Sequence, residues 1–177
     1  DGLGKSASVF DMDKLNWTNS HFIKTGDVPR LARLLGEMIR ANANFDPAQD
    51  YLEAIVPLYQ PRAKTIKEMA EQAAFFLHDA QSLPYDQAAV DKFLTPEIRE
   101  HLKVLAQRME ALEAFDHQRL EAMAGAYLEE TGLKFKALAQ PIRVAITGTT
   151  MSPGLFETME VLGRERTLER FRKALTL

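Results

Sequence analysis

The stretch QPIRVAITG at residues 140–148, followed by SPGLFE at 152–157 and LGRERTL at 162–168, is the most informative part of this chain. The first stretch has the apolar spacing of a helix face, and the Thr, Gly, Ser and Pro residues after it are typical of a loop. Two more helices are predicted beyond the loop. Taken alone, these residues predict ordinary packing of helices and no particular function.

Upstream of this region the apolar residues recur at helical spacing, and no alternating run of strand length competes with them. We therefore predict an all-α fold with short turns. The last of three apolar stripes passes through Pro141, so a kink or a break is expected near Gln140. The stripes are Ile98, Leu102, Leu105, Met109 and Leu112; Leu120, Met123, Ala124, Tyr127 and Leu128; and Phe135, Leu138, Ala139, Ile142 and Ile146.

Helix starts and stops are marked by short polar residues, by proline and by glycine. Gly132 is expected to end a helix. Two composition changes, near Gly26-Asp27 and near Ser82-Leu83-Pro84, predict boundaries, which divide the chain into residues 1–26, 27–84 and 85–177. The residues placed to cap a following helix are Asp27, Asp46-Pro47, Asp86, Thr95-Pro96 and Asp116.

Composition sets broad limits on the function. The chain has 177 residues, of which 46% are hydrophobic, so it can bury a real core. The absence of cysteine excludes disulfides and Cys-based zinc sites. Because there is no apolar run of about 20 residues and no secretory signal, we expect a cytoplasmic protein without a membrane partner.

Charge is unevenly distributed along the chain, whose net charge is −3. Residues 68–130 carry thirteen acidic and five basic side chains, whereas residues 131–177 carry eight basic and four acidic ones. A polyanion would therefore meet the basic C-terminal part, with the acidic middle turned to solvent. The alternative is that these charges are simply solvated helix faces.

No catalytic or metal-binding constellation is predicted. The four histidines lack the spacing and the partners of a zinc site. The start of the chain, Gly2-Leu3-Gly4-Lys5-Ser6, lacks the full spacing of a phosphate-binding loop and is interpreted as a flexible start. The carboxylate pair Glu129-Glu130 is expected to be solvated on a helix surface.

In their order and spacing, the three C-terminal stretches at residues 140–148, 152–157 and 162–168 resemble the C-terminus of bacterial glutamyl-tRNA synthetases. Two upstream segments resemble other sequence motifs of that family, in the same order: VFDMDKLNWTNSHFI at residues 9–23 and YQPRAKTIKE at 59–68. The resemblance covers essentially the whole chain. The catalytic domain of the family, with its His-Ile-Gly-His and Lys-Met-Ser-Lys signatures, does not occur in this sequence.

The resemblance implies a monomeric, tRNA-binding part of a larger enzyme. Residues 1–26 would be a remnant of the domain that contacts the tRNA stem, and residues 27–84 and 85–177 two small helical anticodon-binding subdomains. The expected partner is glutamate tRNA, with no role for DNA. The parent enzyme would use ATP and Mg²⁺, whereas this part would need no cofactor and would be inactive alone.

Arg62 follows Pro61 at the expected junction between two helices, where a fixed backbone can direct a guanidinium outward. The bland interpretation of this residue is a salt bridge at a helix end. The resemblance implies that Arg62 reads the third anticodon base. Glutamate anticodons end in cytosine and glutamine anticodons in guanine, so this residue predicts discrimination between the two tRNAs.

Arg143 lies just upstream of the loop and resembles the family arginine that contacts the first or second anticodon base. Ser152, Pro153 and Leu155 match the loop that holds those bases. Unstacked bases need such a pocket of apolar surface with a few donors and acceptors. The bland interpretations are a carboxylate partner for Arg143 and plain helix packing for Leu155.

Two other functions stay open at this point. A helical protein-interaction scaffold would show an exposed apolar stripe and no outward arginines in a groove. A small helical enzyme would need a pocket with perturbed titratable groups, for which the sequence offers no candidate set.

Overall fold

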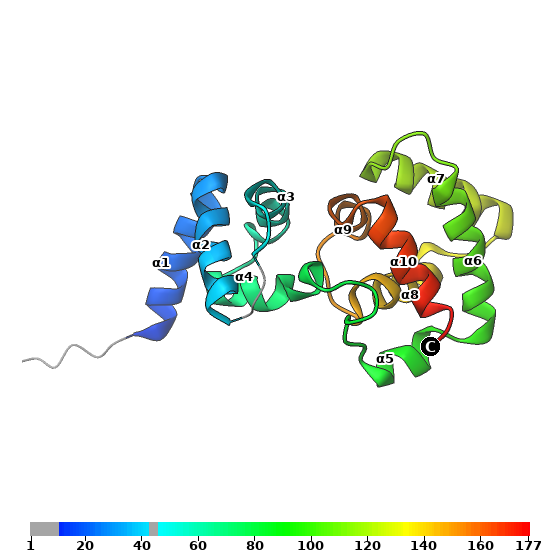
Figure 1. Cartoon of the computed structure of the whole chain (residues 1–177), viewed down its shortest axis with the longest axis horizontal. Coiled ribbons are helices and arrows are strands. Elements are labelled where there is room, and N and C mark those ends of the chain that lie inside the picture. Colours follow the sequence, from blue (N-terminus) through cyan, green and yellow to red (C-terminus); the bar gives the residue numbers. More distant parts are fainter. Residues whose placement is uncertain (1–10, 43–45) are drawn as a thin grey trace, which may run out of the picture.

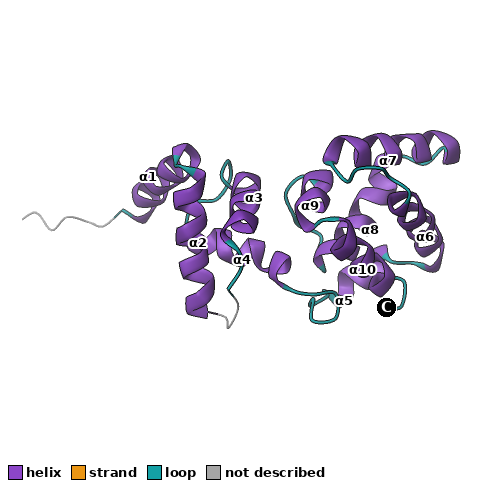
Figure 2. Cartoon of the chain, turned by 45° about the horizontal axis from the view of Figure 1, so that its top comes forward, coloured by secondary structure: helices purple, strands orange, loops and turns teal. Residues whose placement is uncertain are grey.

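The computed structural model describes residues 11–42 and 46–177 of the chain. Within these ranges every regular element is a helix, which confirms the all-α prediction (Figure 2). The start at Gly2–Ser6 lies outside the described residues. The elements are α1 (Met12–Thr25), α2 (Val28–Asn42), α3 (Gln49–Tyr59), α4 (Ile66–Ala73), the short 3-10 helix η1 (Ala74–Leu77), α5 (Gln87–Phe93), α6 (Pro96–Glu110), α7 (His117–Thr131), α8 (Phe135–Thr147), α9 (Leu155–Leu162) and α10 (Arg164–Ala174).

Four of the five predicted N-caps are confirmed. Asp86, Thr95 and Asp116 accept hydrogen bonds from the backbone N–H groups that begin α5, α6 and α7, and Asp27 does the same for α2. The prediction for Asp46-Pro47 was wrong, because α3 begins at Gln49 after Ala48, which makes no side-chain cap. Asp46 instead accepts a hydrogen bond of 2.7 Å from Arg40.

The helices form two groups along the long axis of the molecule (Figure 1). In the first group α2 packs against α3 and α4, and α1 lies at its edge with Ile23 as its buried residue. In the second group α10 packs against α6 and α8, α7 against α9, and α5 against α8. The two groups meet where α3 contacts α9.

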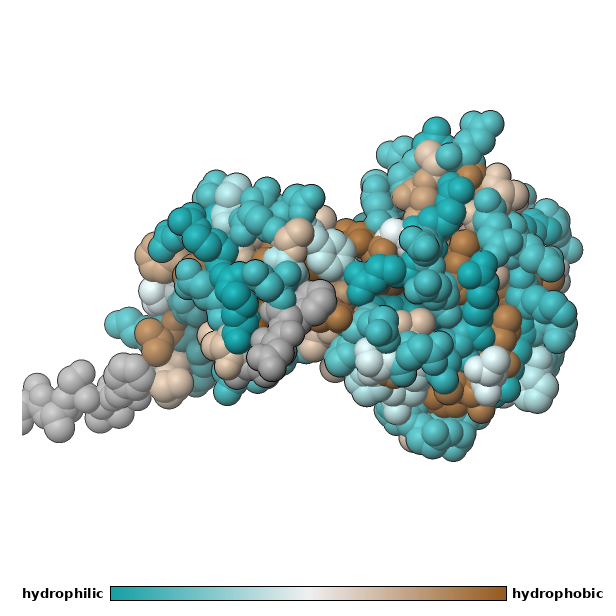
Figure 3. All heavy atoms as spheres, viewed as in Figure 1, coloured by the Kyte–Doolittle hydropathy of each residue, from teal (hydrophilic) through white to brown (hydrophobic). Residues whose placement is uncertain are grey.

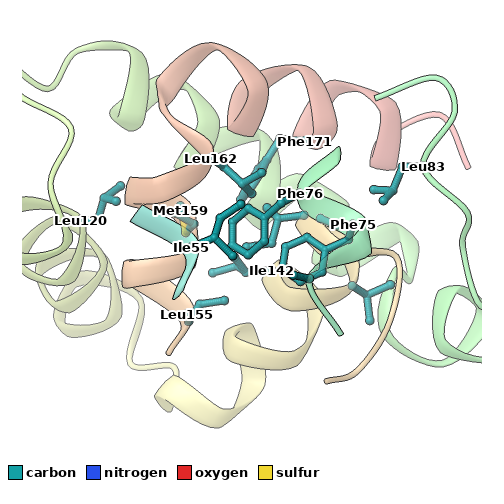
Figure 4. Packing of buried hydrophobic residues seen from close by; sticks show 14 of the residues in the cluster. Ile55, Phe75, Phe76, Leu83, Leu120, Ile142, Leu155, Met159, Leu162 and Phe171 are labelled. Atoms are coloured by element: carbon teal, nitrogen blue, oxygen red, sulfur yellow. The ribbon is translucent and has the colours of Figure 1, made fainter. Parts of the chain in front are cut away.

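Two phenylalanines of η1 connect the cores of the two groups. Phe75 and Phe76 are buried, and their ring centroids lie 4.3 Å apart. Figure 4 shows Phe76 among Ile55 of α3, Met159 of α9 and other residues of the second group. One continuous hydrophobic cluster therefore runs through both groups.

The structure shows no break near Gln140, the position where Pro141 predicted a kink or a break. α8 continues through this proline without a break, and Leu138, Ile142 and Ile146 on both sides of it are buried. Packing of this apolar face outweighs the loss of one backbone donor at the proline. Phe135, the first residue of the predicted stripe, is 46% exposed, because it lies at the open end of α8.

The surface in Figure 3 is mostly hydrophilic, with apolar residues in small patches and a waist between the two groups. Among the described residues, no helix is both long and apolar enough to cross a bilayer.

Candidate functional site

The turn between α3 and α4 holds Arg62 at the surface. The backbone N–H groups of Arg62 and Ala63 both donate to the Tyr59 carbonyl at 2.9 Å, and Ala63 is buried. The Arg62 side chain is exposed and forms no ion pair within the described part of the chain. The backbone of the turn is thus fixed, while the guanidinium keeps its donors available.

Side chains from neighbouring elements fix the same turn from outside. The Gln60 amide donates to the carbonyls of Ile23 and Gly26 at 3.0 and 2.7 Å. Asn19 of α1 donates to the Lys64 carbonyl at 2.6 Å, and Glu68 of α4 accepts from the Lys64 N–H at 2.8 Å. These contacts hold the turn between α1 and α4.

Arg143 lies beneath the loop that follows α8. Its Nε donates to the Ser152 hydroxyl at 2.8 Å, and that hydroxyl donates to the Pro153 carbonyl at 3.0 Å. The described residues offer Arg143 no carboxylate partner, and burial lowers the pKa of its guanidinium. Arg143 therefore supports the loop from behind.

The linker between the two groups fixes the start of the loop. Gly148 has a φ of 77°, and its carbonyl accepts from the Asp86 N–H at 2.9 Å. A Cβ on Gly148 would lie 2.0 Å from the Pro84 carbonyl oxygen. The Tyr85 hydroxyl donates to the Ala145 carbonyl at 2.9 Å. Only glycine fits this approach of two backbones.

A groove of about 560 Å³ lies between the turn and the loop. It brings together three residues that the sequence singled out, Arg62 on one wall and Ser152 and Pro153 on the other. Arg143 lies behind Ser152, and Leu155 is only 5% exposed, as the first residue of α9 in the core. The lining residues are Tyr59, Arg62, Glu71, Gln72, Ala74, Phe75, His78, Pro84, Thr147, Thr149, Met151, Ser152 and Pro153.

Sequence reasoning missed the wall that α4 and η1 contribute. Glu71, Phe75 and His78 line the groove and recur at steps of four and three, the spacing of one helix face. That spacing was a signal that could have been used, once Arg62 was placed next to the same helix. Met151, which is 79% exposed, rises from the opposite wall.

A second hollow, of about 360 Å³, lies on the other side of Arg62, against α1. Trp17 is 72% exposed there, and its ring is stacked on His21 with centroids 6.4 Å apart. Lys24 and Lys64 also line this hollow. Arg62 stands on the ridge between the two hollows, where an aromatic face and cations suit a stacked base and phosphates.

Four of the eight basic side chains in residues 131–177, the segment predicted to meet a polyanion, are arginines of α10, and these are engaged within the molecule. Arg166 and Arg170 donate to backbone carbonyls inside the molecule, and Arg164 donates to the Leu112 carbonyl. Arg172 pairs with Glu110 at 2.7 Å. Among the described residues that line the groove, Arg62 is the one Lys or Arg side chain, and Lys24 and Lys64 line the second hollow.

A family model described as an anticodon binding domain matches residues 30–175. The glutamate–tRNA ligase of Geotalea uraniireducens is 43% identical over 173 residues, which cover 98% of this chain and 37% of the relative. That of Syntrophobacter fumaroxidans is 41% identical over 175 residues, covering 99% and 37%. The chain thus spans little more than a third of the length of these relatives.

A solved structure is also similar to this chain. The crystal structure of a glutamate tRNA ligase from Elizabethkingia meningosepticum, in complex with its amino acid, superimposes with a TM-score of 0.84. The match covers 94% of this chain and 32% of that one, at 22% sequence identity. At this identity the likeness shows the fold, and it agrees with the helical arrangement described above.

Proposed function

This chain belongs to the anticodon binding domain family, and we propose that it recognises the anticodon loop of glutamate tRNA as the C-terminal part of a glutamate–tRNA ligase. The parent would attach glutamate to tRNA in the cytoplasm, with ATP and Mg²⁺. Residues 1–26 would be the stem-contact remnant, and 27–84 and 85–177 the two anticodon-binding subdomains. This part alone would charge no tRNA.

The observation that carries the proposal is the position of Arg62 on the wall of the groove, exposed and with its guanidinium donors unused by any carboxylate in the described residues. A guanidinium offers only N–H donors, and the Watson–Crick edge of cytosine offers the adjacent acceptors O2 and N3. The pair fits two parallel hydrogen bonds. Arg62 would therefore bind the third anticodon base when it is cytosine.

The same geometry would disfavour glutamine tRNA. A guanine at the third position presents its N1–H and N2–H donors to the donors of Arg62, so polar groups would be left unpaired. Each unsatisfied group costs about 1–3 kcal/mol. We therefore propose that the parent enzyme discriminates against glutamine tRNA.

The opposite wall suits the neighbouring bases of the loop. Ser152 and Pro153 offer a hydroxyl, a carbonyl and a small apolar surface, and Arg143 holds the Ser152 hydroxyl in place. Arg143 makes no other side-chain hydrogen bond within the described residues, so its terminal amino groups would be available to a base that enters beside the loop. Leu155 would contribute through packing beneath the loop, since its side chain is buried.

A protein-interaction scaffold is the alternative, and one feature favours it. α1 exposes an apolar stripe that includes Met12 at 55%, Leu15 at 46% and Phe22 at 66%. A scaffold of this kind would bind no tRNA, so one binding experiment separates the two functions.

The test measures binding of the purified chain to glutamate tRNA, to glutamine tRNA, and to glutamate tRNA with guanine at the third anticodon position. We expect the first to bind most tightly and the third to resemble glutamine tRNA. Affinity should fall steeply with salt, because phosphate contacts release counterions. Equal binding of all three RNAs, or no binding at low salt, would overturn the proposal.

A further inference from the structure

The most unusual charged group in the molecule is Arg170 of α10, which is 0% exposed. Its guanidinium donates to the carbonyls of Phe75 and His78 at 2.7 and 2.6 Å and to that of Ile146. Its Nε has no hydrogen-bond partner in the described residues. Burial lowers the pKa of this guanidinium to about 10.

Arg166, one helical turn earlier on α10, reaches the same segment. It donates to the carbonyls of Phe76 and His78 at 2.6 and 2.9 Å and to the Tyr51 hydroxyl at 2.6 Å. Its guanidinium also lies 5.5 Å from the centre of the Tyr51 ring. Within the described residues no carboxylate lies within ion-pair distance of either arginine.

Stability alone does not account for this pair. Burial of a cation without a counter-charge costs several kcal/mol, and a well-packed apolar side chain usually serves a core at least as well. Repulsion by the Arg166 guanidinium also lowers the pKa of Arg170. What the arginines provide, and an apolar residue would not, is a set of directed donors to particular carbonyls.

Those carbonyls lie directly behind the groove. Phe75 and His78 line its wall on the Arg62 side, and Ile146 immediately precedes Thr147 on the opposite side. Phe75 lies within η1, and His78 directly follows its last residue. One guanidinium on α10 therefore holds both walls of the groove from behind.

We infer that Arg170, supported by Arg166, is a positioning residue for base recognition. It sets the separation of the two walls, so that Arg62 and the Ser152 loop can hold neighbouring bases of one RNA loop at the same time. This inference rests on the proposed function for its consequence, but the positioning itself can be measured without RNA.

The first arm of the test measures the separation of the two helix groups. Because the chain has no cysteine, Glu37→Cys on α2 and Gln107→Cys on α6 allow two spin labels to be attached at unique exposed sites. We expect a narrow distance distribution in the labelled chain that keeps Arg170, a broad one in Arg170→Met, and an intermediate one in Arg170→Lys. Arg172→Met is the matched control, because Arg172 lies on the same helix and is exposed.

The second arm measures base preference with anticodon stem-loop RNAs that differ at the second or third anticodon position. In Arg170→Lys we expect the preferences at both positions to fall together, by about 2- to 30-fold, the range for residues that couple two sites. Arg172→Met should leave both preferences unchanged.

Arg170→Lys and Arg166→Lys keep the charge and are the variants to use if Arg170→Met does not fold. A distance distribution as narrow in the folded arginine variants as in the chain that keeps both arginines would overturn the inference, as would a loss of base preference at one anticodon position only. If the unsubstituted chain binds no RNA, the proposed function fails, whereas the distance measurement still tests the positioning role.

Discussion

At the scale of the residue, Gly148 is the position where a single methyl group has the largest predicted effect. Gly148→Ala would meet the Pro84 carbonyl oxygen at 2.0 Å and would also hold alanine at a φ of 77°. The left-handed backbone costs about 1–2 kcal/mol, and the collision adds to it. We expect a loss of unfolding free energy clearly above 2 kcal/mol in urea denaturation.

Gly132→Ala is the matched control, because Gly132 has a φ of 69° but no atom within 4 Å of the added Cβ. It should show the backbone cost alone, about 1–2 kcal/mol. If both variants lose the same free energy, the linker does not approach the loop as closely as the structure shows.

His117 gives a pH-dependent prediction at the same scale. Its Nδ1 lies 2.7 Å from a Glu160 carboxylate oxygen, and that hydrogen bond raises the pKa of the imidazole above its usual value of about 6.5. Because the folded pKa is raised, the stabilisation is fully present below pH ~6.5 and is lost as pH rises through the folded pKa.

NMR titration of the His117 ring checks this directly. Glu160→Gln should move the pKa of His117 down toward its ordinary value and remove the part of the pH dependence of stability that lies above pH ~6.5. An unchanged titration curve in Glu160→Gln would contradict the pairing.

The residues themselves differ in how far they could be predicted. The outward direction of the Arg62 side chain was predictable, because a proline and two flanking helices fix the turn, so that an arginine at this position must point outward. The inward contacts of Arg166 and Arg170 were not, because arginine is a surface residue by default and nothing local in the sequence around LGRERTL marks Arg170 as buried or Arg166 as partly buried. Both arginines are held inside by carbonyl groups about 90 residues away in the chain.

At the scale of the element, caps and apolar stripes predicted several of the helices. Thr95 and Asp116 began helices as predicted, because the cap depends on residues within one turn. Asp46 failed because Arg40 pairs with it across the connection between α2 and α3, an interaction that no local pattern contains. A kink or a break was expected near Gln140, and the break does not occur, because tertiary burial of α8 favours a continuous helix.

The element made of α8, its loop and α9 carries the next prediction. Arg143→Ala removes the donor that holds the Ser152 hydroxyl, so the loop should lose its fixed position. We expect weaker binding of both glutamate and glutamine tRNA, which share the middle uridine, with little change in the preference between them. Binding curves for both tRNAs measure this, and Lys136→Ala, exposed on the same helix, is the control.

A change in the preference alone, with the affinity for glutamate tRNA retained, would contradict this role of Arg143. It would place Arg143 at the third base instead.

At the scale of the whole molecule, the groove could not be predicted as a shape. Its walls come from residues 59–84 and 147–153, which the sequence analysis placed in different subdomains. Their approach depends on Phe75, Phe76 and the arginines of α10, contacts that link distant parts of the chain. Periodicity predicts elements, whereas a groove between two groups of helices is fixed only when they pack together.

The ratio of charging efficiencies for glutamate and glutamine tRNA in the full-length parent enzyme tests the claim that Arg62 reads the third anticodon base. Arg62→Gln should reduce this ratio, and the corresponding free-energy preference for glutamate tRNA should fall by about 1–3 kcal/mol. The reason is that an amide can turn either donors or an acceptor toward the base and so tolerate guanine. Arg33→Gln, an exposed arginine on α2, should leave it unchanged. An unchanged ratio in Arg62→Gln would contradict the claim.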